Sequence, residues 1–413
     1  MLRPDAGDKA RLEHTIRTST SPIQAANGFG RFPLHPLVQR GIEAAGFSEP
    51  RPIQSEAIPA ALEGRDLLGL AQTGTGKTAA FALPVLSRLL AEPKPGPRVL
   101  ILAPTRELAG QIDADIRSLA RFTALKSITL FGGVSVRPQG QALRLRPDIL
   151  VGCPGRILDL LEQRLLRLDK IDTLILDEAD HMFDMGFLPD VRRIIHTLPP
   201  RRQNLLFAAT MPLEIRALAN ALLREPHVAE LVHSKPASTI DHALYPVGGD
   251  TKLWMLEQVL SEEAFVSAIV FTRTKHRASR LAQQLSRGGH RAVALQGNMS
   301  QGQRDKAMEG FRKRRFDVLV ATDIAARGLD VEQVSHVVNF DMPGTPEAYT
   351  HRIGRTGRSE RDGKAYTFVM PEDQAMVRDV ERRIGTSIPR RSLRGAGSPA
   401  LMMGRRAAVR TAR

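Results

Sequence analysis

The sequence is poor in cysteine and in aromatic side chains. Its 413 residues include one cysteine, Cys153, and one tryptophan. A single cysteine excludes an internal disulfide and any cysteine-rich zinc site, and it favours a reducing, cytoplasmic setting. No apolar run is long enough to cross a bilayer, and the first residues lead into no apolar signal core. We therefore expect neither a membrane protein nor a secreted one.

Acidic residues are also scarce, most of all near the end of the sequence. The formal net charge is +15, and residues 389–413 contain seven arginines and no aspartate or glutamate. Such an excess favours a polyanionic partner, because neutralising phosphates drives non-specific binding to nucleic acids. Many basic proteins bind no nucleic acid, so charge alone does not decide the function. We expect residues 389–413 to be a basic, disordered tail.

The length of the chain predicts two domains, because 413 residues exceed one ordinary hydrophobic core. Short continuous apolar runs alternate with helical stretches, as buried parallel strands do in doubly wound α/β sheets. The expected strands are 67–70, 99–102, 128–131, 149–151, 174–176, 205–207, then 268–271, 292–295, 318–320, 337–340 and 366–369. A polar stretch at 233–238 predicts a linker. We expect a flexible leader over 1–28, then domains over 29–235 and 236–388.

A phosphate-binding loop follows the first expected strand and opens a helix. Its residues are Ala71, Gln72, Thr73, Gly74, Thr75, Gly76, Lys77 and Thr78. The glycines let backbone amides face a phosphate, Lys77 is suited to the β- and γ-phosphates, and Thr78 is suited to magnesium. A chance glycine-rich turn is the alternative, but the order of strand, loop, Lys-Thr and helix argues against it.

An acidic tetrad, Asp177-Glu178-Ala179-Asp180, ends the apolar run at 174–176. In this kind of sheet it lies beside the phosphate loop. Asp177 is suited to hold hydrated magnesium, and Glu178 to orient and deprotonate the water that attacks the γ-phosphate. An acidic helix N-terminus is the alternative explanation.

The tetrad and the segments around it resemble the DEAD-box helicase family, and most closely its bacterial RhlE-like members. The resemblance extends from about Phe29 to Ile388 and implies two tandem RecA-like domains. Gln54 matches the family's adenine-reading glutamine, which implies ATP as the nucleotide. Phe29 matches an upstream aromatic that stacks on the base, although an ordinary core phenylalanine is the alternative.

The resemblance also implies a set of RNA contacts made mainly to the sugar–phosphate backbone. In the first domain the matching residues are Pro104, Thr105, Arg106, Gly132, Gly133, Pro154, Gly155 and Arg156. In the second domain they are Arg273, Thr274, Gln301, Arg304 and Thr322. Turns and helix caps are the alternative roles of the first-domain segments.

Arginines in the second domain complete the implied site. Residues 351–358 read His-Arg-Ile-Gly-Arg-Thr-Gly-Arg. By the resemblance, Arg355 and Arg358 reach the γ-phosphate as arginine fingers, and Asp330 faces the ribose. We expect His351 and Arg352 to hold the two domains together around the site. A basic exposed loop is the alternative.

Four positions depart from the family's pattern: Arg51, Cys153, Ala208 and Gln296. Ala208 has the clearest consequence, because the family's serine there carries a hydroxyl that can bond toward Asp180. Thr210 remains as a partial substitute. None of the four is in the phosphate loop, so we expect hydrolysis to be intact and its coupling to strand separation to be the weaker function.

These observations predict an enzyme that couples RNA-stimulated ATP hydrolysis to local, non-processive opening of RNA duplexes. An ATP-gated RNA clamp or assembly platform with little turnover is the alternative from another class. A DNA-specific helicase is a third hypothesis. It differs in its use of the 2′-hydroxyl, by which a protein can tell RNA from DNA. A small-molecule kinase would share only the phosphate loop with this sequence, and no segment supplies its acceptor site. The expected cofactors are ATP and magnesium, and the expected partners are RNA and ribosomal or RNA-decay assemblies, with no membrane.

Overall fold

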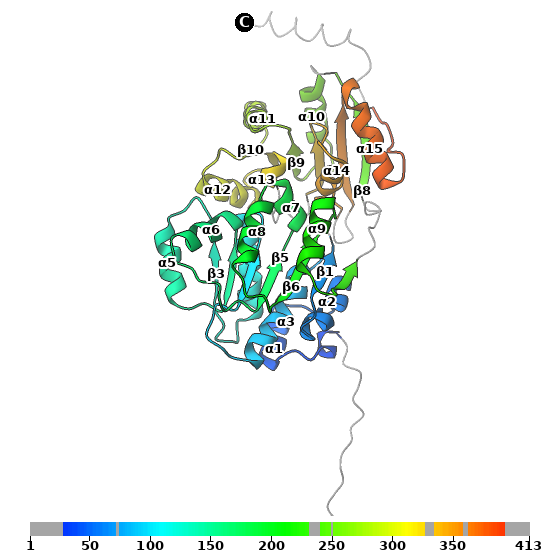
Figure 1. Ribbon diagram of the computed structural model, residues 1–413. Helices are drawn as coiled ribbons and strands as arrows, with labels where there is room; N and C mark the ends of the chain where they lie inside the picture. The colour runs from blue at the N-terminus through cyan, green and yellow to red at the C-terminus, as the bar shows by residue number, and fades with distance from the viewer. Residues whose placement is uncertain are drawn as a thin grey trace, which may run out of the picture.

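The computed structural model describes residues 28–71, 74–230, 240–248, 251–326, 334–357 and 362–392. Two α/β domains follow one another along the chain, each with a parallel sheet at its centre (Figure 1). The predicted leader apart from Gly28, the linker at 233–238 and the tail beyond residue 392 lie outside the described residues. None of the described helices is long and apolar enough to span a membrane.

The first domain has a seven-stranded sheet in the order β3-β4-β2-β5-β6-β1-β7, with all neighbours parallel. Its strands are β1 (Leu67–Leu70), β2 (Val99–Leu102), β3 (Ser127–Leu130), β4 (Ile149–Gly152), β5 (Thr173–Leu176), β6 (Gln203–Ala208) and β7 (His227–Glu230). Its helices are η1 (Gly28–Arg31), α1 (Pro36–Ala44), α2 (Pro52–Leu62), α3 (Lys77–Ala91), α4 (Arg106–Leu119), α5 (Val136–Arg144), α6 (Pro154–Glu162), α7 (Ala179–Asp184), α8 (Leu188–His196) and α9 (Leu213–Leu222).

The second domain repeats this plan with a six-stranded parallel sheet in the order β10-β11-β9-β12-β13-β8. Its strands are β8 (Ile240–Pro246), β9 (Ala268–Phe271), β10 (Ala292–Leu295), β11 (Val318–Ala321), β12 (His336–Asn339) and β13 (Gly363–Val369). Its helices are α10 (Lys252–Leu260), α11 (Lys275–Arg287), α12 (Gln301–Arg312), α13 (Asp323–Ala326), α14 (Pro346–Ile353), η3 (Pro371–Asp373) and α15 (Gln374–Ile384).

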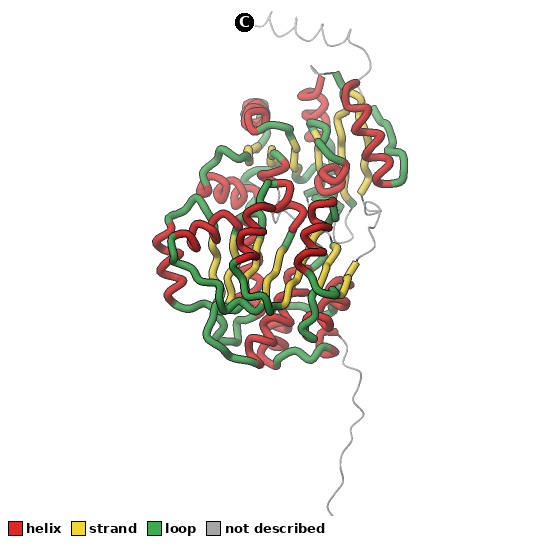
Figure 2. The backbone as a smooth tube through the Cα atoms, in the orientation of Figure 1, coloured by secondary structure: helices red, strands yellow, loops and turns green. Residues whose placement is uncertain are grey.

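Helices cover both faces of each sheet (Figure 2). Successive residues of a strand alternate between the two resulting cores. In β2, Val99 and Ile101 belong to the core with α1–α4, while Leu100 and Leu102 belong to the core with α6–α9. This period of two explains why the runs are continuously apolar: both faces of each strand are buried.

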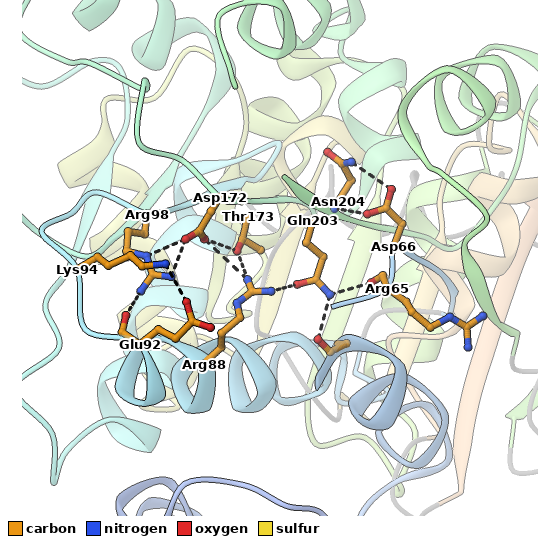
Figure 3. Close-up of polar contacts among 11 residues, drawn as sticks. Arg65, Asp66, Arg88, Glu92, Lys94, Arg98, Asp172, Thr173, Gln203 and Asn204 are labelled. Carbon is orange, nitrogen blue, oxygen red and sulfur yellow. Dashed lines mark hydrogen bonds and ion pairs between the residues drawn. The ribbon is translucent and has the colours of Figure 1, made fainter. Parts of the chain in front are cut away.

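Polar side chains connect the amino ends of the first domain's strands, at the edge of the sheet opposite the phosphate loop (Figure 3). The Arg98 Nε donates to the Asp172 carboxylate at 2.7 Å. Arg88 of α3 donates to the Gln203 and Thr173 side chains. Asp66 accepts from the backbone N–H of Asn204 at 2.7 Å. These contacts fix the register of the strands at the amino edge of the sheet. The opposite, carboxyl edge is left for a ligand.

Replacing Asp66 with alanine is expected to destabilise the first domain by about 1–3 kcal/mol, because buried backbone N–H groups would lose their acceptor. Asp66 is buried, and its carboxylate also accepts from the backbone N–H of Arg224 at 2.8 Å. Urea unfolding of the full chain measures the change. Asp169→Ala, which removes an exposed carboxylate, is the matched control. Equal midpoints for the two variants would contradict the role given to Asp66.

The boundary predicted for the basic tail at residue 389 is wrong. The Leu244 N–H donates to the Pro389 carbonyl at 2.8 Å, and the Arg391 N–H donates to the Leu244 carbonyl at 2.9 Å. Arg390 also pairs with Glu381 at 2.7 Å. Residues 389–392 therefore extend the edge of the second sheet, which an arginine-rich composition alone did not indicate.

Candidate active site and nucleic-acid interface

A cavity of about 520 Å³ lies between the two domains at the carboxyl edge of the first sheet. The phosphate loop contributes Gly74, Gly76, Lys77 and Thr78 to its lining, the tetrad contributes Asp177 and Glu178, and the second domain contributes Arg355. Ligands of open α/β sheets bind at this edge, where the loops after the strands meet. The structure thus brings together the predicted phosphate-binding, acidic and finger residues that it describes.

The phosphate loop has the backbone geometry that its glycines allow. Gly76 has φ of +94°, a conformation that disfavours any side chain, and a Cβ there would also displace the Gln54 Nε2, which would lie 2.5 Å away. Lys77 then begins α3, and its buried Nζ has no hydrogen-bond partner among the described residues. A buried ammonium that faces a cavity and lacks a hydrogen bond is suited to a phosphate. Gln72 and Thr73 lie outside the described residues, and Ala71 donates its N–H to the Ala208 carbonyl at 3.0 Å.

The acidic side chains lie beside Lys77 and are almost completely buried. The Lys77 Nζ is 3.7 Å from the Asp177 Oδ1. Burial raises the pKa of Asp177 to about 6, and the Lys77 ammonium opposes that rise. Glu178 occupies the left-handed region with φ of 52°, a strained conformation for a residue with a side chain. Strain held at a buried carboxylate is typical of functional sites.

The glutamine predicted to read adenine is held by the protein on both of its polar atoms. Gln54 accepts from the Arg51 N–H at 2.8 Å and donates to the Gly76 carbonyl at 3.1 Å. Its amide still has a second N–H and a second lone pair. Gln54 therefore joins the start of α2 to the phosphate loop. Arg51, a departure from the family's threonine, donates to the Gly74 carbonyl at 2.5 Å and adds a second such link.

Phe29 does not line the cavity. Its ring is 3% exposed and packs edge-on against Phe32 and Phe47, with centroids 6.2 and 6.0 Å away. These are the contacts of the alternative, a core phenylalanine, and stacking of Phe29 on a base stays a prediction. Phe47 is the aromatic residue that lines the cavity.

Helix α4 contributes cavity residues that the sequence analysis missed. Gln111, Asp115 and Ser118 line the cavity together with Leu108 and Leu119. The polar three are spaced by four and three residues, so they share one helix face. That spacing on the helix after Thr105 is the signal that could have identified them.

A second cavity of about 350 Å³ unites most of the first-domain residues predicted to contact RNA with residues of the second domain. It is lined by Pro104, Thr105, Arg106, Glu107, Gly132, Cys153, Gly155, Arg156, Met185, Phe187, Gly297, Met299 and Arg304. Arg304 donates to Glu107 at 2.9 Å, and this ion pair joins the two domains. The Arg106 side chain packs against Gly133, which has φ of +71°. A Cβ on residue 133 would lie 2.0 Å from the Arg106 Nη2.

Several of the predicted RNA residues have structural contacts of their own. Thr105 caps α4, which is the helix-cap role named as an alternative for the first-domain segments, and Thr274 caps α11. Arg156 is buried, with its Nη2 donating to the Val134 carbonyl at 2.9 Å. Pro154 is the first residue of α6. Cys153 precedes it without a side-chain cap, and burial raises its thiol pKa to about 12, so it stays protonated.

Three more of the second-domain residues that we predicted to contact RNA lie among the described residues. Arg273 lies 3.7 Å from Asp373, Thr322 is partly exposed after β11, and Gln301 begins α12, although its side chain is not described. Arg358 and Asp330 lie outside the described residues. The Gln296 side chain, where the family has histidine, accepts from the Asn298 N–H at 2.6 Å.

The hydrogen bonds described for Arg352 all lie within the second domain, so its predicted role in holding the two domains together stays a prediction. Arg352 is 3% exposed and bonds to Asp323 through two nitrogens, at 2.6 and 2.7 Å. It also donates to the Asn339 side chain and the Asp341 carbonyl. All these partners belong to the second domain, and the Asp323 carboxylate matches the fork of the guanidinium. His351 does cross the cleft: its Nδ1 is 3.4 Å from the His181 Nε2.

Asp180 is bound to the loop after β6 as the resemblance implies, but without help from residue 208. Its Oδ2 accepts from the Thr210 hydroxyl at 3.0 Å and from the N–H groups of Ala209 and Thr210. Ala208 is fully buried at the end of β6. Thr210 thus makes a hydroxyl contact to Asp180, and the Asp180 Oδ1 has no partner among the described residues.

Two parallel-sheet domains that enclose a phosphate loop, an acidic tetrad and an arginine from the opposite domain define a nucleotide-hydrolysing motor of the tandem RecA-like class. The DEAD/DEAH box helicase model matches residues 51–218, and the helicase conserved C-terminal domain model matches residues 251–360. The chain belongs to the DEAD-box family of ATP-dependent RNA helicases.

Individual relatives agree with this assignment. The chain is 42% identical to the ATP-dependent RNA helicase CshA of Listeria monocytogenes over 354 residues, covering 86% of this chain and 68% of that one. It is 44% identical to the RNA helicase CrhR of Synechocystis, covering 83% and 70%. Its fold matches S. cerevisiae Dbp5 bound to RNA and ADP BeF3, with a TM-score of 0.79 and 32% identity, over 89% of this chain and 96% of that one. The closer likeness to RhlE-like members stays a prediction.

Proposed function

We propose that this protein opens short RNA duplexes locally, in cycles driven by ATP hydrolysis in the cavity between its domains. The observation that carries the proposal is the lining of that cavity, in which Lys77, Glu178 and Arg355 face one space from two domains. Hydrolysis then depends on closure, because the arginine arrives only with the second domain.

In the proposed chemical step, Lys77 and the loop amides bind the phosphates and Glu178 takes the proton of the attacking water. His181 orients Glu178, since their side chains meet at 2.8 Å. Arg355 stabilises the charge that develops on the transferred group. The carboxylate of Asp177 and the hydroxyl of Thr78 are the residues suited to magnesium, which would neutralise phosphate charge.

RNA would lie across the second cavity and contact both domains through loop amides, hydroxyls and guanidinium groups. Closure brings Arg304 to Glu107, so a bound strand can be gripped from two sides. Such contacts reach the backbone and not the base edges, which suits action on many sequences. We place this activity in the cytoplasm, and ribosomal or RNA-decay assemblies are the partners we propose.

Displacement of a labelled strand from a short RNA duplex tests the proposal. We expect ATP to support repeated cycles of strand release. We expect little release with a non-hydrolysable analogue, because it cannot support repeated cycles. If ATP supports stable RNA binding without strand release, the protein is an ATP-gated clamp instead.

Deleting residues 393–413 is expected to weaken RNA binding and to flatten its dependence on salt. The segment holds five arginines and no acidic residue, and a chain that neutralises fewer phosphates releases fewer counterions on binding. The deletion begins after the ordered residues 389–392, so the second domain keeps its edge. RNA affinity measured at several salt concentrations gives the slope. A slope equal to that of the full chain would show that residues 393–413 do not contribute to RNA binding.

Ala208→Ser is expected to raise the number of duplexes opened per ATP while leaving the hydrolysis rate nearly unchanged. The new hydroxyl would add a contact to Asp180, whose Oδ1 has no partner among the described residues. A hydrogen bond to a charged group contributes about 1.5–3 kcal/mol, or about one to two powers of ten in the closed–open equilibrium. Ala243→Ser, at a buried position in β8, is the control. An unchanged ratio of unwinding to hydrolysis would make the hydroxyl irrelevant.

A further inference from the structure

Three potential metal ligands meet where α7 faces the second domain. Asp180 and His181 belong to α7, His351 belongs to α14, and each offers one ligand atom within 4.8 Å of the others. Figure 1 shows α7 at the side of the first domain that meets the second. The cluster is separate from the residues assigned to magnesium, Asp177 and Thr78.

The two imidazole nitrogens are as far apart as two ligands of a tetrahedral metal ion. The His181 Nε2 and the His351 Nδ1 are 3.4 Å apart, and their rings are inclined at 80°. Two nitrogens that bind zinc at its usual distance and at the tetrahedral angle lie about 3.3–3.4 Å apart. The same separation is long for a hydrogen bond between two ring nitrogens.

The third residue, Asp180, has a buried carboxylate oxygen without a hydrogen-bond partner among the described residues. Asp180 is 3% exposed, and its Oδ2 is occupied by Ala209 and Thr210. Its Oδ1 is buried and has no hydrogen-bond partner among the described residues. A charged oxygen in that position costs free energy unless something binds it.

The protonation states also fit. The His181 Nδ1 lies 2.8 Å from the Glu178 Oε2 and donates to it, which leaves the Nε2 with a free lone pair. This is the carboxylate–histidine–metal arrangement that orients many zinc ligands. A neutral His351 ring can offer the lone pair of its Nδ1 in the same way.

We propose that Asp180, His181 and His351 form a site for a zinc-class transition-metal ion that fastens the two domains in their closed arrangement. A water molecule would be the fourth ligand. Bound metal would oppose reopening and would tie His181 and the neighbouring Glu178 to the metal centre. We expect micromolar-range zinc to slow turnover as a result, and this consequence alone rests on the proposed function.

Cobalt(II) binding to the full chain tests the site, because tetrahedral Co²⁺ has a strong visible absorption band. The titration is done in excess Mg²⁺, both without ligands and with RNA and a non-hydrolysable ATP analogue, because the two histidines belong to domains that close on these ligands. We expect one equivalent of Co²⁺ to give the band and one equivalent of Zn²⁺ to abolish it. A wild-type chain that gives no band, or only the weak band of an octahedral ion, overturns the proposal.

Two variants remove one ligand each from opposite domains. His181→Asn keeps a donor near Glu178 but lacks the Nε2, and His351→Gln lacks the Nδ1. Each is expected to weaken Co²⁺ binding by more than about 100-fold, beyond the usual effect of losing a group that only supports a ligand. His196→Asn, at an exposed histidine on α8, is expected to bind as the wild type does. Undiminished binding in either folded ligand variant overturns the site, and circular dichroism verifies the fold.

The kinetic consequence is measured separately. If Co²⁺ binds as expected and Zn²⁺ leaves RNA-stimulated turnover unchanged, the metal does not fasten the domains and that part of the proposal fails. If the chain binds Co²⁺ but never hydrolyses ATP, the metal site stands and the proposed function fails.

Discussion

Arg355→Ala is expected to lower RNA-stimulated ATP hydrolysis by about 1,000- to 100,000-fold, the usual contribution of an arginine finger. Arg355 is 6% exposed and lines the cavity that also holds Lys77 and Glu178. Its guanidinium reaches that cavity from the second domain, so its loss removes positive charge where the transition state becomes more negative. Single-turnover hydrolysis at saturating ATP and RNA measures the chemical step.

The matched control is Arg291→Ala, which removes an exposed arginine of the same domain that pairs with Asp317. It is expected to hydrolyse ATP normally. For the same reason, residues 1–235 alone should hydrolyse ATP poorly. Full RNA-stimulated activity in that fragment, or in Arg355→Ala, would rule out a finger supplied across the cleft.

Glu178→Gln is expected to reduce turnover by about 100- to 10,000-fold while ATP and RNA still bind. The substitution keeps the shape of the side chain but removes its ability to accept a proton. Binding of a fluorescent ATP analogue and of labelled RNA separates affinity from chemistry. Glu162→Gln, at an exposed glutamate on α6, is the control. A variant with near-normal turnover would show that Glu178 is not the base.

The sequence predicted the strands well because buried parallel strands are apolar on both faces. Every expected run lies in or overlaps a strand of the structure. The two strands that were missed, β7 and β8, lie at edges of their sheets. Their residues, HVAE and IDHALYP, contain neither a continuous apolar run nor a regular alternation of polar and apolar residues. Tertiary pairing decides such segments, and no local pattern contains it.

The phosphate-binding half of the site was predictable because its chemistry is local. Residues 74–78 are adjacent in sequence, and their spacing reports their geometry directly. Contacts across the cleft between the domains were harder to predict from the sequence. Arg352 was expected to bridge the domains, yet Asp323 holds it within its own domain. Which of two neighbouring side chains, His351 or Arg352, faces outward depends on how α14 packs, and the sequence does not state that orientation.

The loop after β6, which binds Asp180, was also only partly predictable from the sequence. The absence of a hydroxyl at Ala208 was visible in the sequence, but the position of the Thr210 hydroxyl on Asp180 was not. The effect of Ala208 is therefore smaller than the removal of every hydroxyl from Asp180 would be. His181 is a comparable case: its bond to Glu178 follows from a three-residue helical spacing, while its approach to His351 requires both domains.

ATP hydrolysis measured in parallel without nucleic acid, with single-stranded RNA and with single-stranded DNA tests the central claim most directly. If the domains close on ATP and RNA to bring Arg355 to the phosphates, turnover should be low alone, should rise strongly with RNA and should rise little with DNA. Equal rates in all three samples would contradict the account, because hydrolysis would then not depend on a closure that RNA promotes.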